Sequence, residues 1–238
     1  MVSQLKLGDI AVDVMFKDIR NVYLSVHPPT GRVRISAPSH MSLNRIRVFA
    51  ISKLAWIRKH QTKLRGQERE TPREYLDRES HHVWGKRYLL KVIESEEPPA
   101  IELKHSEMLL RLRPRTHHTK KQAVMEEWYR NQVKEAAPRL IAKWEPVMGV
   151  NVDRFFVQQM KTKWGSCNPR TRSIRLNTDL AKKAPELLEY IVVHEMAHLI
   201  ARHHDDRFTR LMDKCLPNWK LLRQGLNSTP LAHADWAY

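Results

Sequence analysis

The sequence has only two cysteines, Cys167 and Cys215, among its 238 residues. Two cysteines are too few for the disulfide framework that holds small secreted domains together, or for a zinc site built from thiolates. Such sparing use of cysteine is typical of a reducing compartment. We therefore expect a cytoplasmic protein whose fold depends on its apolar core.

The chain also lacks any long apolar run. A membrane-spanning helix needs about 20 consecutive apolar residues, and no stretch of the sequence approaches this length. The first residues, MVSQLKLGDIAVDV, do not show the basic start and apolar run that mark a secretory signal. These absences predict a soluble protein with no membrane partner.

Acidic residues are scarce relative to basic ones. The chain has 26 Asp and Glu against 42 Lys and Arg, a formal net charge of +16 and a sequence pI near 10.1. Such a charge attracts polyanions, so nucleic acid is a candidate partner, although a solvated basic surface explains the composition equally well. The candidate patches are Arg58, Lys59, Lys63 and Arg65 near the N-terminus, and Arg111, Arg113, Arg115, Lys120 and Lys121 in the middle.

The N-terminal part of the chain is predicted to be rich in β-structure. A chain of this length can form one domain with an appendage or two small domains, with a sizeable core. Apolar and polar residues alternate in short segments over residues 9–38, with turn residues between them, which predicts a meander of short strands. Ser42 can cap a helix that runs towards Leu64 and carries a basic face.

A polar segment separates this part from a second β-rich stretch. Residues 66–80 show no apolar periodicity and are predicted to link the two. Alternation resumes over residues 81–113, with a turn at 96–99. We therefore assign residues 1–118 to a β-rich N-terminal region with one basic helix.

The C-terminal part is predicted to mix helices and strands. A helix is expected from Thr119 to about Trp144, followed by strands at residues 152–160 and 173–176. Pro185 is favoured in a first helical turn, and the run LLEYIVV that follows it is apolar on nearly all sides. Such a helix must be buried, so the predicted fold class is α+β with a buried helix near the C-terminus.

This buried helix contains His194-Glu195-Met196-Ala197-His198, the strongest functional motif of the chain. Residues four apart share one helical face, so His194 and His198 can present imidazole nitrogens to one metal ion. Glu195 lies one position round the helix and can reach a metal-bound water. A zinc hydrolase needs this arrangement, in which the metal acidifies water and the carboxylate transfers its proton. The alternative is a pair of hydrogen-bonded core histidines.

A catalytic zinc ion usually takes three protein ligands, which leaves one histidine to be found. His204 is the predicted third ligand, because the chain can fold back to the ion beyond a helix end near residues 201–202. Neighbouring His203 is the alternative. One zincin group has a glycine midway between its second and third histidines, and Ala201 departs from that pattern. Further candidates for ligation, or for orienting a histidine, are Asp205 and Asp206.

Segments around this motif resemble the YgjP-like metallopeptidase family, which is related to SprT-like proteases. They are MKTKWGSC at 160–167, IRLN at 174–177, EYIVVHEMAHL at 189–199, and His204. Residues 37–38 and 56–57 also suit this family, so the resemblance extends over most of the chain.

The resemblance implies a compact zincin-like domain over residues 119–238, with Glu195 as the catalytic residue. It implies one Zn²⁺ ion per chain, bound by His194, His198 and His204. It also implies that the strand around residues 164–167 lies beside the active-site helix, where an extended peptide can add as a further strand. On this basis the candidate substrate-binding residues are Trp164, Gly165 and Ser166.

Other residues of these segments have structural interpretations. Trp164 and Cys167 are the kinds of residue that more often pack than react, and we do not favour a thiolate switch at Cys167. Asn177 is expected to cap the following helix. Tyr190, one turn before His194, is a candidate core residue rather than an assigned oxyanion donor.

The sequence supports three functional hypotheses. The leading one is zinc-dependent hydrolysis of peptide bonds in a peptide or protein substrate. The second is metal-dependent hydrolysis of a nucleotide or other phosphoanhydride, because cations stabilise phosphate charge. The third is a nucleic-acid-associated protease module recruited by its basic surface. The cations behind the second hypothesis are Lys161, Lys163, Arg170, Arg172 and Arg175.

Overall fold

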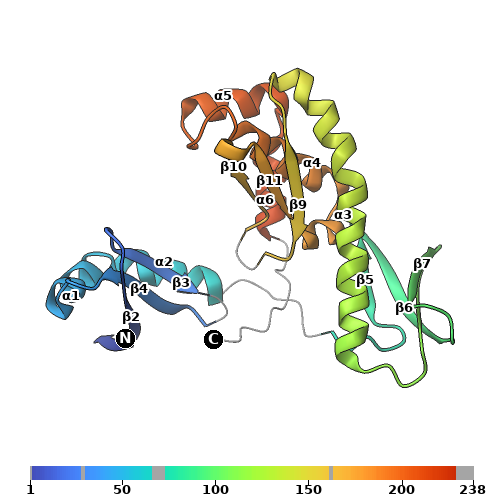
Figure 1. Ribbon diagram of the computed structural model, residues 1–238, viewed down its shortest axis with the longest axis horizontal. Helices are drawn as coiled ribbons and strands as arrows, with labels where there is room; N and C mark the ends of the chain where they lie inside the picture. The colour runs from blue at the N-terminus through green and yellow to red at the C-terminus, as the bar shows by residue number, and fades with distance from the viewer. Residues whose placement is uncertain (1, 28–29, 66–72, 161–162, 229–238) are drawn as a thin grey trace. The chain divides into compact units, whose positions relative to one another are not determined.

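The computed structural model describes residues 2–27, 30–65, 73–160 and 163–228 (Figure 1). The chain divides into two compact units, and residue 71 begins the second one. The boundary expected between residues 118 and 119 lies inside this second unit, at the start of its longest helix. As a division between functional regions, that boundary stays a prediction.

The first unit contains a four-stranded sheet in the order β1-β2-β4-β3. Its strands are β1 (Val2–Leu7), β2 (Ile10–Lys17), β3 (Tyr23–His27) and β4 (Arg32–Pro38). The expected meander is wrong, because β4 pairs in parallel with β2 as well as antiparallel with β3. β4 is therefore a central strand, and its Val33 and Ile35 are fully buried.

Two helices follow this sheet where one was expected. They are α1 (Leu43–Ser52) and α2 (Leu54–Arg65), and the chain leaves the helical conformation between them at Lys53. The predicted cap is confirmed, because the Ser42 side chain accepts the Arg45 N–H at 3.5 Å. Ile46 and Ile57 are fully buried in the same core as the strands, so the helices cover one face of the sheet.

The second unit begins with a sheet in the order β5-β6-β8-β7, the same topology as in the first unit. Its strands are β5 (Ser80–Val83), β6 (Lys86–Glu94), β7 (Ala100–Lys104) and β8 (Glu107–Leu112). The expected β-rich stretch and its turn at 96–99 are confirmed. In each of these two sheets one pair of strands is parallel, β2 with β4 and β6 with β8. The same strand topology therefore occurs twice in the chain without a repeat in its sequence.

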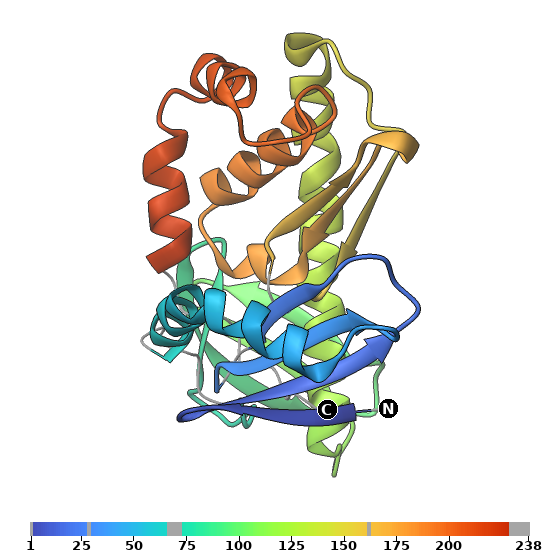
Figure 2. The same cartoon turned by 90° about the vertical axis from the view of Figure 1, so that its left-hand side faces the viewer.

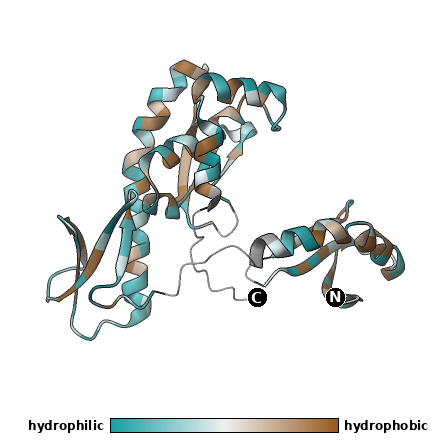
Figure 3. Cartoon of the chain, turned by 180° about the vertical axis from the view of Figure 1, so that it is seen from behind, coloured by the Kyte–Doolittle hydropathy of each residue, from teal (hydrophilic) through white to brown (hydrophobic). Residues whose placement is uncertain are grey.

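The longest helix of the second unit is α3 (His118–Met148). It extends beyond the predicted helix at its C-terminal end and stops where Gly149 adopts a left-handed conformation with φ 65°. Apolar and polar residues alternate along it in Figure 3, as expected for a helix buried on one side. Its buried residues are Met125, Tyr129, Val133, Ala137, Ile141, Trp144 and Met148.

A second sheet of this unit has the order β10-β11-β9, so β10 is an edge strand. Its strands are β9 (Arg154–Gln158), β10 (Gly165–Asn168) and β11 (Ser173–Asn177), with short 3-10 helices η1 (Pro169–Thr171) and η2 (Thr178–Lys182) after β10 and β11. Three helices complete the unit: α4 (Pro185–Ala197), α5 (Asp206–Cys215) and α6 (Trp219–Ser228).

The α4 helix is buried between the other elements of this unit. It contacts the helices α3, α5 and α6, and it also contacts the strands β10 and β11 (Figure 2). The α+β class, with an N-terminal β-rich part and a buried helix, is confirmed. Among the described residues no helix is both long and apolar enough to cross a membrane.

Candidate active site

The α4 helix positions three of the expected site residues. It begins at Pro185 as predicted, and its buried side chains pack it into the core of the unit. The regular helix ends at Ala197, earlier than expected, and His198 is its C-terminal cap with φ −69° and ψ −13°. Turns continue to Ala201, whose N–H donates to the Ala197 carbonyl at 2.9 Å. His194 and His198 therefore still face the same side.

The three predicted metal ligands, His194, His198 and His204, meet at one point. Each offers a ring nitrogen, and these nitrogens all lie within 4.8 Å of one another. The Nε2 atoms of His194 and His204 are 3.1 Å apart. Two nitrogens bound to one tetrahedral zinc ion lie about 3.3 Å apart, given bonds of about 2.0–2.1 Å. The spacing of His194 and His204 therefore suits a zinc-sized ion.

A hydrogen bond holds the His198 ring in the tautomer that can bind a metal through Nε2. His198 Nδ1 lies 3.1 Å from the Ala201 carbonyl, which makes this nitrogen the donor and leaves Nε2 free to ligate. Phe208 of α5 is buried beneath the cluster, with its ring centroid 4.6 to 5.0 Å from all three imidazoles. Burial lowers the pKa of His194 to about 3, and the neighbouring His198 acts in the same direction, so this imidazole is neutral.

The segment after α4 makes its turn without glycine. Ala201 is buried and does not have a positive φ, so the departure from the glycine pattern causes no backbone strain. His203, the alternative ligand, is exposed and is not part of the cluster. Asp205 is the N-terminal cap of α5 and accepts the Phe208 N–H at 3.0 Å. Asp206 lies in the first turn of that helix.

Glu195 is buried next to the histidines, with 5% of its surface exposed. Burial raises the pKa of this carboxyl to about 8, and Lys163 opposes the shift. Gly165 of β10 lies directly against it, because a Cβ atom on Gly165 would lie 2.6 Å from Glu195 Oε1. The edge strand thus packs its backbone on the Glu195 side chain, a contact that the motif spacing does not reveal.

A cavity of about 780 Å³ opens in front of these residues. Gly165 and Ser166 line it, whereas Trp164 does not and instead packs against the core with Lys183 Nζ 5.6 Å above its ring. Cys167 also lines the cavity, but burial raises the pKa of its thiol to about 11. A thiol with that pKa is neutral, in keeping with the structural interpretation of Cys167.

Asn177 has a larger role than the expected cap. Its Oδ1 accepts the Asp179 N–H at 3.1 Å and so caps η2, as predicted. Its Nδ2 donates to the carbonyls of Met160 and Lys163, both at 2.8 Å. This buried amide therefore fixes the chain on both sides of residues 161–162 and sets where β10 begins. The sequence pattern, an asparagine just before a helix, did not predict these two hydrogen bonds from the Asn177 side chain.

Tyr190 is a core residue in the structure. Only 3% of its surface is exposed, and its ring lies edge-on to His194 with centroids 5.7 Å apart. Burial raises the pKa of its hydroxyl, so Tyr190 stays neutral. It supports His194 from the preceding helical turn.

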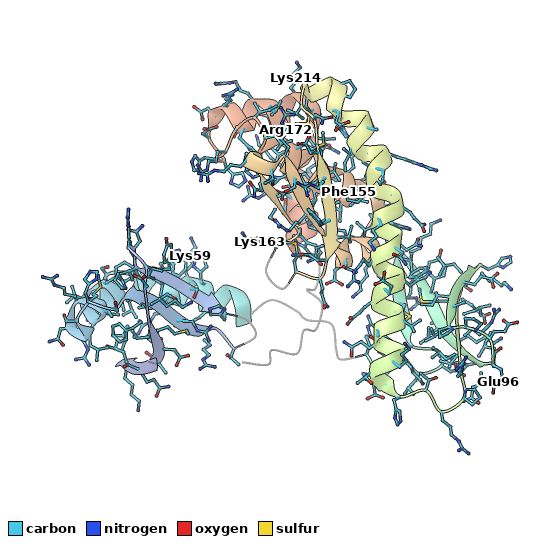
Figure 4. All side chains as sticks on the ribbon, viewed as in Figure 1. Lys59, Glu96, Phe155, Lys163, Arg172 and Lys214 are labelled. Carbon is cyan, nitrogen blue, oxygen red and sulfur yellow. The ribbon has the colours of Figure 1, made fainter. Side chains whose placement is uncertain are left out.

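The cations of the second hypothesis separate into two groups. Lys163, Arg170 and Arg175 line the cavity, whereas Arg172 lies outside its lining, 3.9 Å from Asp153. Figure 4 shows Lys163 and Arg172 at opposite ends of the sheet. Lys161 lies outside the described residues.

The candidate nucleic-acid patches lie in different units. Arg58 on α2 has a 3.4 Å contact with Asp9, and the side chains of Lys63 and Arg65 lie outside the described residues. Arg111 on β8 forms a 2.8 Å ion pair with Glu97. Arg58 and Lys59 are exposed in the first unit, and Arg113, Arg115 and Lys120 are exposed in the second. Recruitment to nucleic acid stays a prediction.

A family model for the YgjP-like metallopeptidase domain matches residues 20–229. The chain belongs to the YgjP-like family. The resemblance noted in the sequence is thereby confirmed, and so is the coarser functional assignment to metal-dependent peptidases. A search of curated proteins finds no match.

Two solved structures are similar to part of this YgjP-like chain. The metallopeptidase zymogen abylysin of Pyrococcus abyssi is 21% identical, with 38% of this chain and 90% of that chain covered and a TM-score of 0.36. The metallopeptidase zymogen jannalysin of Methanocaldococcus jannaschii is 20% identical, with 40% and 92% covered and a TM-score of 0.33. The assignment rests on the family match, which spans both units of the YgjP-like chain.

Proposed function

We propose that the chain is a zinc metallopeptidase in which His194, His198 and His204 hold the ion and Glu195 acts as general base. The observation that carries this proposal is the convergence of three imidazole nitrogens within 4.8 Å, beside a buried carboxylate and in an open cavity. Three imidazoles are a ligand set that suits zinc and leaves a fourth position open. One ion per chain follows from the single cluster of this kind among the described residues.

The bound ion would supply Lewis acidity, which polarises the scissile carbonyl and makes water a better nucleophile. Glu195 would accept a proton from that water and deliver it to the leaving amine. Gly165 packs directly against the carboxylate and so limits where its oxygens can lie. Burial of Glu195 keeps bulk water from competing for its proton.

The edge strand β10 supports a peptide as the substrate. It pairs with β11 on one side only, so the backbone groups of its other edge can pair with an extended chain. Gly165 and Ser166 line the cavity and are the proposed contacts for the substrate backbone. Trp164 would act indirectly, by anchoring the start of β10 in the core.

The test compares the wild type with Glu195→Gln on an unfolded protein and on a panel of nucleoside triphosphates. Gln keeps the shape of Glu but cannot accept the proton, so we expect retained zinc and a loss of cleavage of about 10²–10⁴-fold. Glu186→Gln, at an exposed position of the same helix, is the matched control and should cleave normally.

Undiminished cleavage by the Glu195→Gln enzyme would contradict the assigned role. Release of phosphate or diphosphate that depends on Glu195 would instead favour the nucleotide-hydrolase hypothesis. Absence of zinc from both proteins would remove the metal assignment itself.

A further inference from the structure

The walls of the candidate active-site cavity carry an unbalanced charge. Among the described residues that line it, four side chains are cationic and Glu195 is the only acidic one. The cations come from separate elements, which together surround the histidine cluster. They are Lys163, Arg170, Arg175 and Arg202.

These four cations form no ion pair with any carboxylate that the structure describes. Other cations of the second unit are paired, such as Lys143 with Glu189 at 2.7 Å and Lys182 with Asp179 at 2.7 Å. Arg175 stacks on an aromatic ring, with its guanidinium carbon 5.6 Å from the centre of the Phe156 ring. Unpaired cations around a concave site attract an anionic ligand and bring it to the reacting groups.

The positions of the cations match a peptide that lies along β10. Lys163 precedes the strand by two residues, close to where Gly165 touches Glu195. Arg170 follows the other end of the strand, whose first and last residues lie about 10 Å apart at roughly 3.3 Å per residue. Arg202 lies between His198 and His204 in sequence and also lines the cavity. An extended substrate therefore meets a cation near the scissile bond and another beyond the far end of the strand, at least about three residues away.

We infer that this site selects peptides with acidic side chains near the scissile bond and further along the β10 edge, through Lys163, Arg170, Arg175 and Arg202. The inference rests on the proposed peptidase function and adds a substrate class to it. A peptide satisfies two features of the cavity at once, because its backbone pairs with the β10 edge while its carboxylates meet the cations. A nucleic acid would use the cations alone, since it has no backbone groups that pair with a strand.

The first experiment uses the zinc-loaded full chain and two peptides derived from one neutral sequence that it cleaves. One peptide carries Glu next to the mapped cleavage site and about three residues from it on either side, and the other carries Gln at the same positions. Exposed ion pairs contribute about two- to fivefold each, so we expect kcat/KM for the Glu peptide to be about tenfold higher. This preference should shrink with added salt. Equal rates for the two peptides would overturn the inference and leave the peptidase function standing.

Two variants assign the preference to the cavity. Arg170→Gln combined with Arg202→Gln should reduce the Glu-to-Gln ratio about fivefold, because both residues are exposed cations of the wall. Arg172→Gln is the matched control, since Arg172 lies outside the lining beside Asp153. If Arg172→Gln reduces the preference for the Glu peptide as much as the double variant does, the cavity is not the source of that preference.

A binding measurement keeps the inference independent of catalysis. Fluorescence anisotropy with Glu195→Gln protein should show tighter binding of the Glu peptide than of the Gln peptide, even if no peptide is cleaved. Equal binding would overturn the inference. A single-stranded oligonucleotide serves as the competing polyanion. If the double variant weakens binding of the oligonucleotide more than binding of the Glu peptide, the cations bind nucleic acid and the acidic-peptide assignment is wrong.

Discussion

Replacement of Gly165 by alanine should disable the site without removing the metal. A Cβ at this position would lie 2.6 Å from Oε1, 2.8 Å from Cγ and 2.9 Å from Cδ of Glu195. Glu195 is buried and cannot swing into solvent, so either its carboxylate or the β10 backbone must move. Overpacking of this kind costs about 1–3 kcal/mol of stability. A displacement of about 1 Å at a catalytic group costs about 10²-fold in rate.

The assay is kcat/KM on an unfolded protein substrate, together with zinc content and the free energy of unfolding. We expect Gly165→Ala to bind zinc normally, because none of the three histidines is touched, and to lose about 10²-fold in kcat/KM. Gly225→Ala is the control, since a Cβ on this α6 glycine meets nothing within 4 Å. Wild-type kcat/KM in Gly165→Ala would refute the view that the strand holds Glu195 in place.

Three further predictions concern the same site. In protein freed of metal, burial raises the pKa of Glu195 from 4.5 to about 8, so the folded state favours the protonated carboxyl. The free energy of unfolding of the wild type should therefore fall as pH rises from 4.5 to 8, by up to about 5 kcal/mol. Glu195→Gln removes that loss, so denaturant titrations should show it to be more stable than the wild type at pH 8 and similar at pH 4.5; parallel profiles would contradict the burial argument. His204→Ala should lose zinc to a competing chelator and His203→Ala should keep it, and the reverse order would exchange their roles. Asn177→Ala should lower the free energy of unfolding in urea by about 2–4 kcal/mol, because it leaves the Met160 and Lys163 carbonyls without their amide donor; an unchanged midpoint would count against the clamp.

The order of the strands could not be predicted from the local pattern. Alternation located the strands of the first unit, but it carries no information about which strands become neighbours. The parallel pairing of β2 with β4 depends on long-range burial of Val33 and Ile35. The break at Lys53 was missed for a related reason, because the basic face of the expected helix continues through it without a proline or glycine.

The sequence by itself determined the features whose physical cause is local. Helical spacing brings His194 and His198 to one face, and Pro185 and Ser42 begin their helices through the properties of single residues. The family follows from motifs within short segments. None of these conclusions depends on what lies across the core.

Only the tertiary structure decided the features that join distant segments. The convergence of His204 rather than His203 depends on how the turn after Ala201 packs on Phe208. The contact of Gly165 with Glu195 links residues 30 positions apart, and Asn177 fixes the start of β10 from the end of a neighbouring strand. The cluster of cations around the site combines four segments. Each of these features depends on how whole helices and strands pack together. Sequence periodicity specifies which face of an element is buried, but it does not specify which other element covers that face.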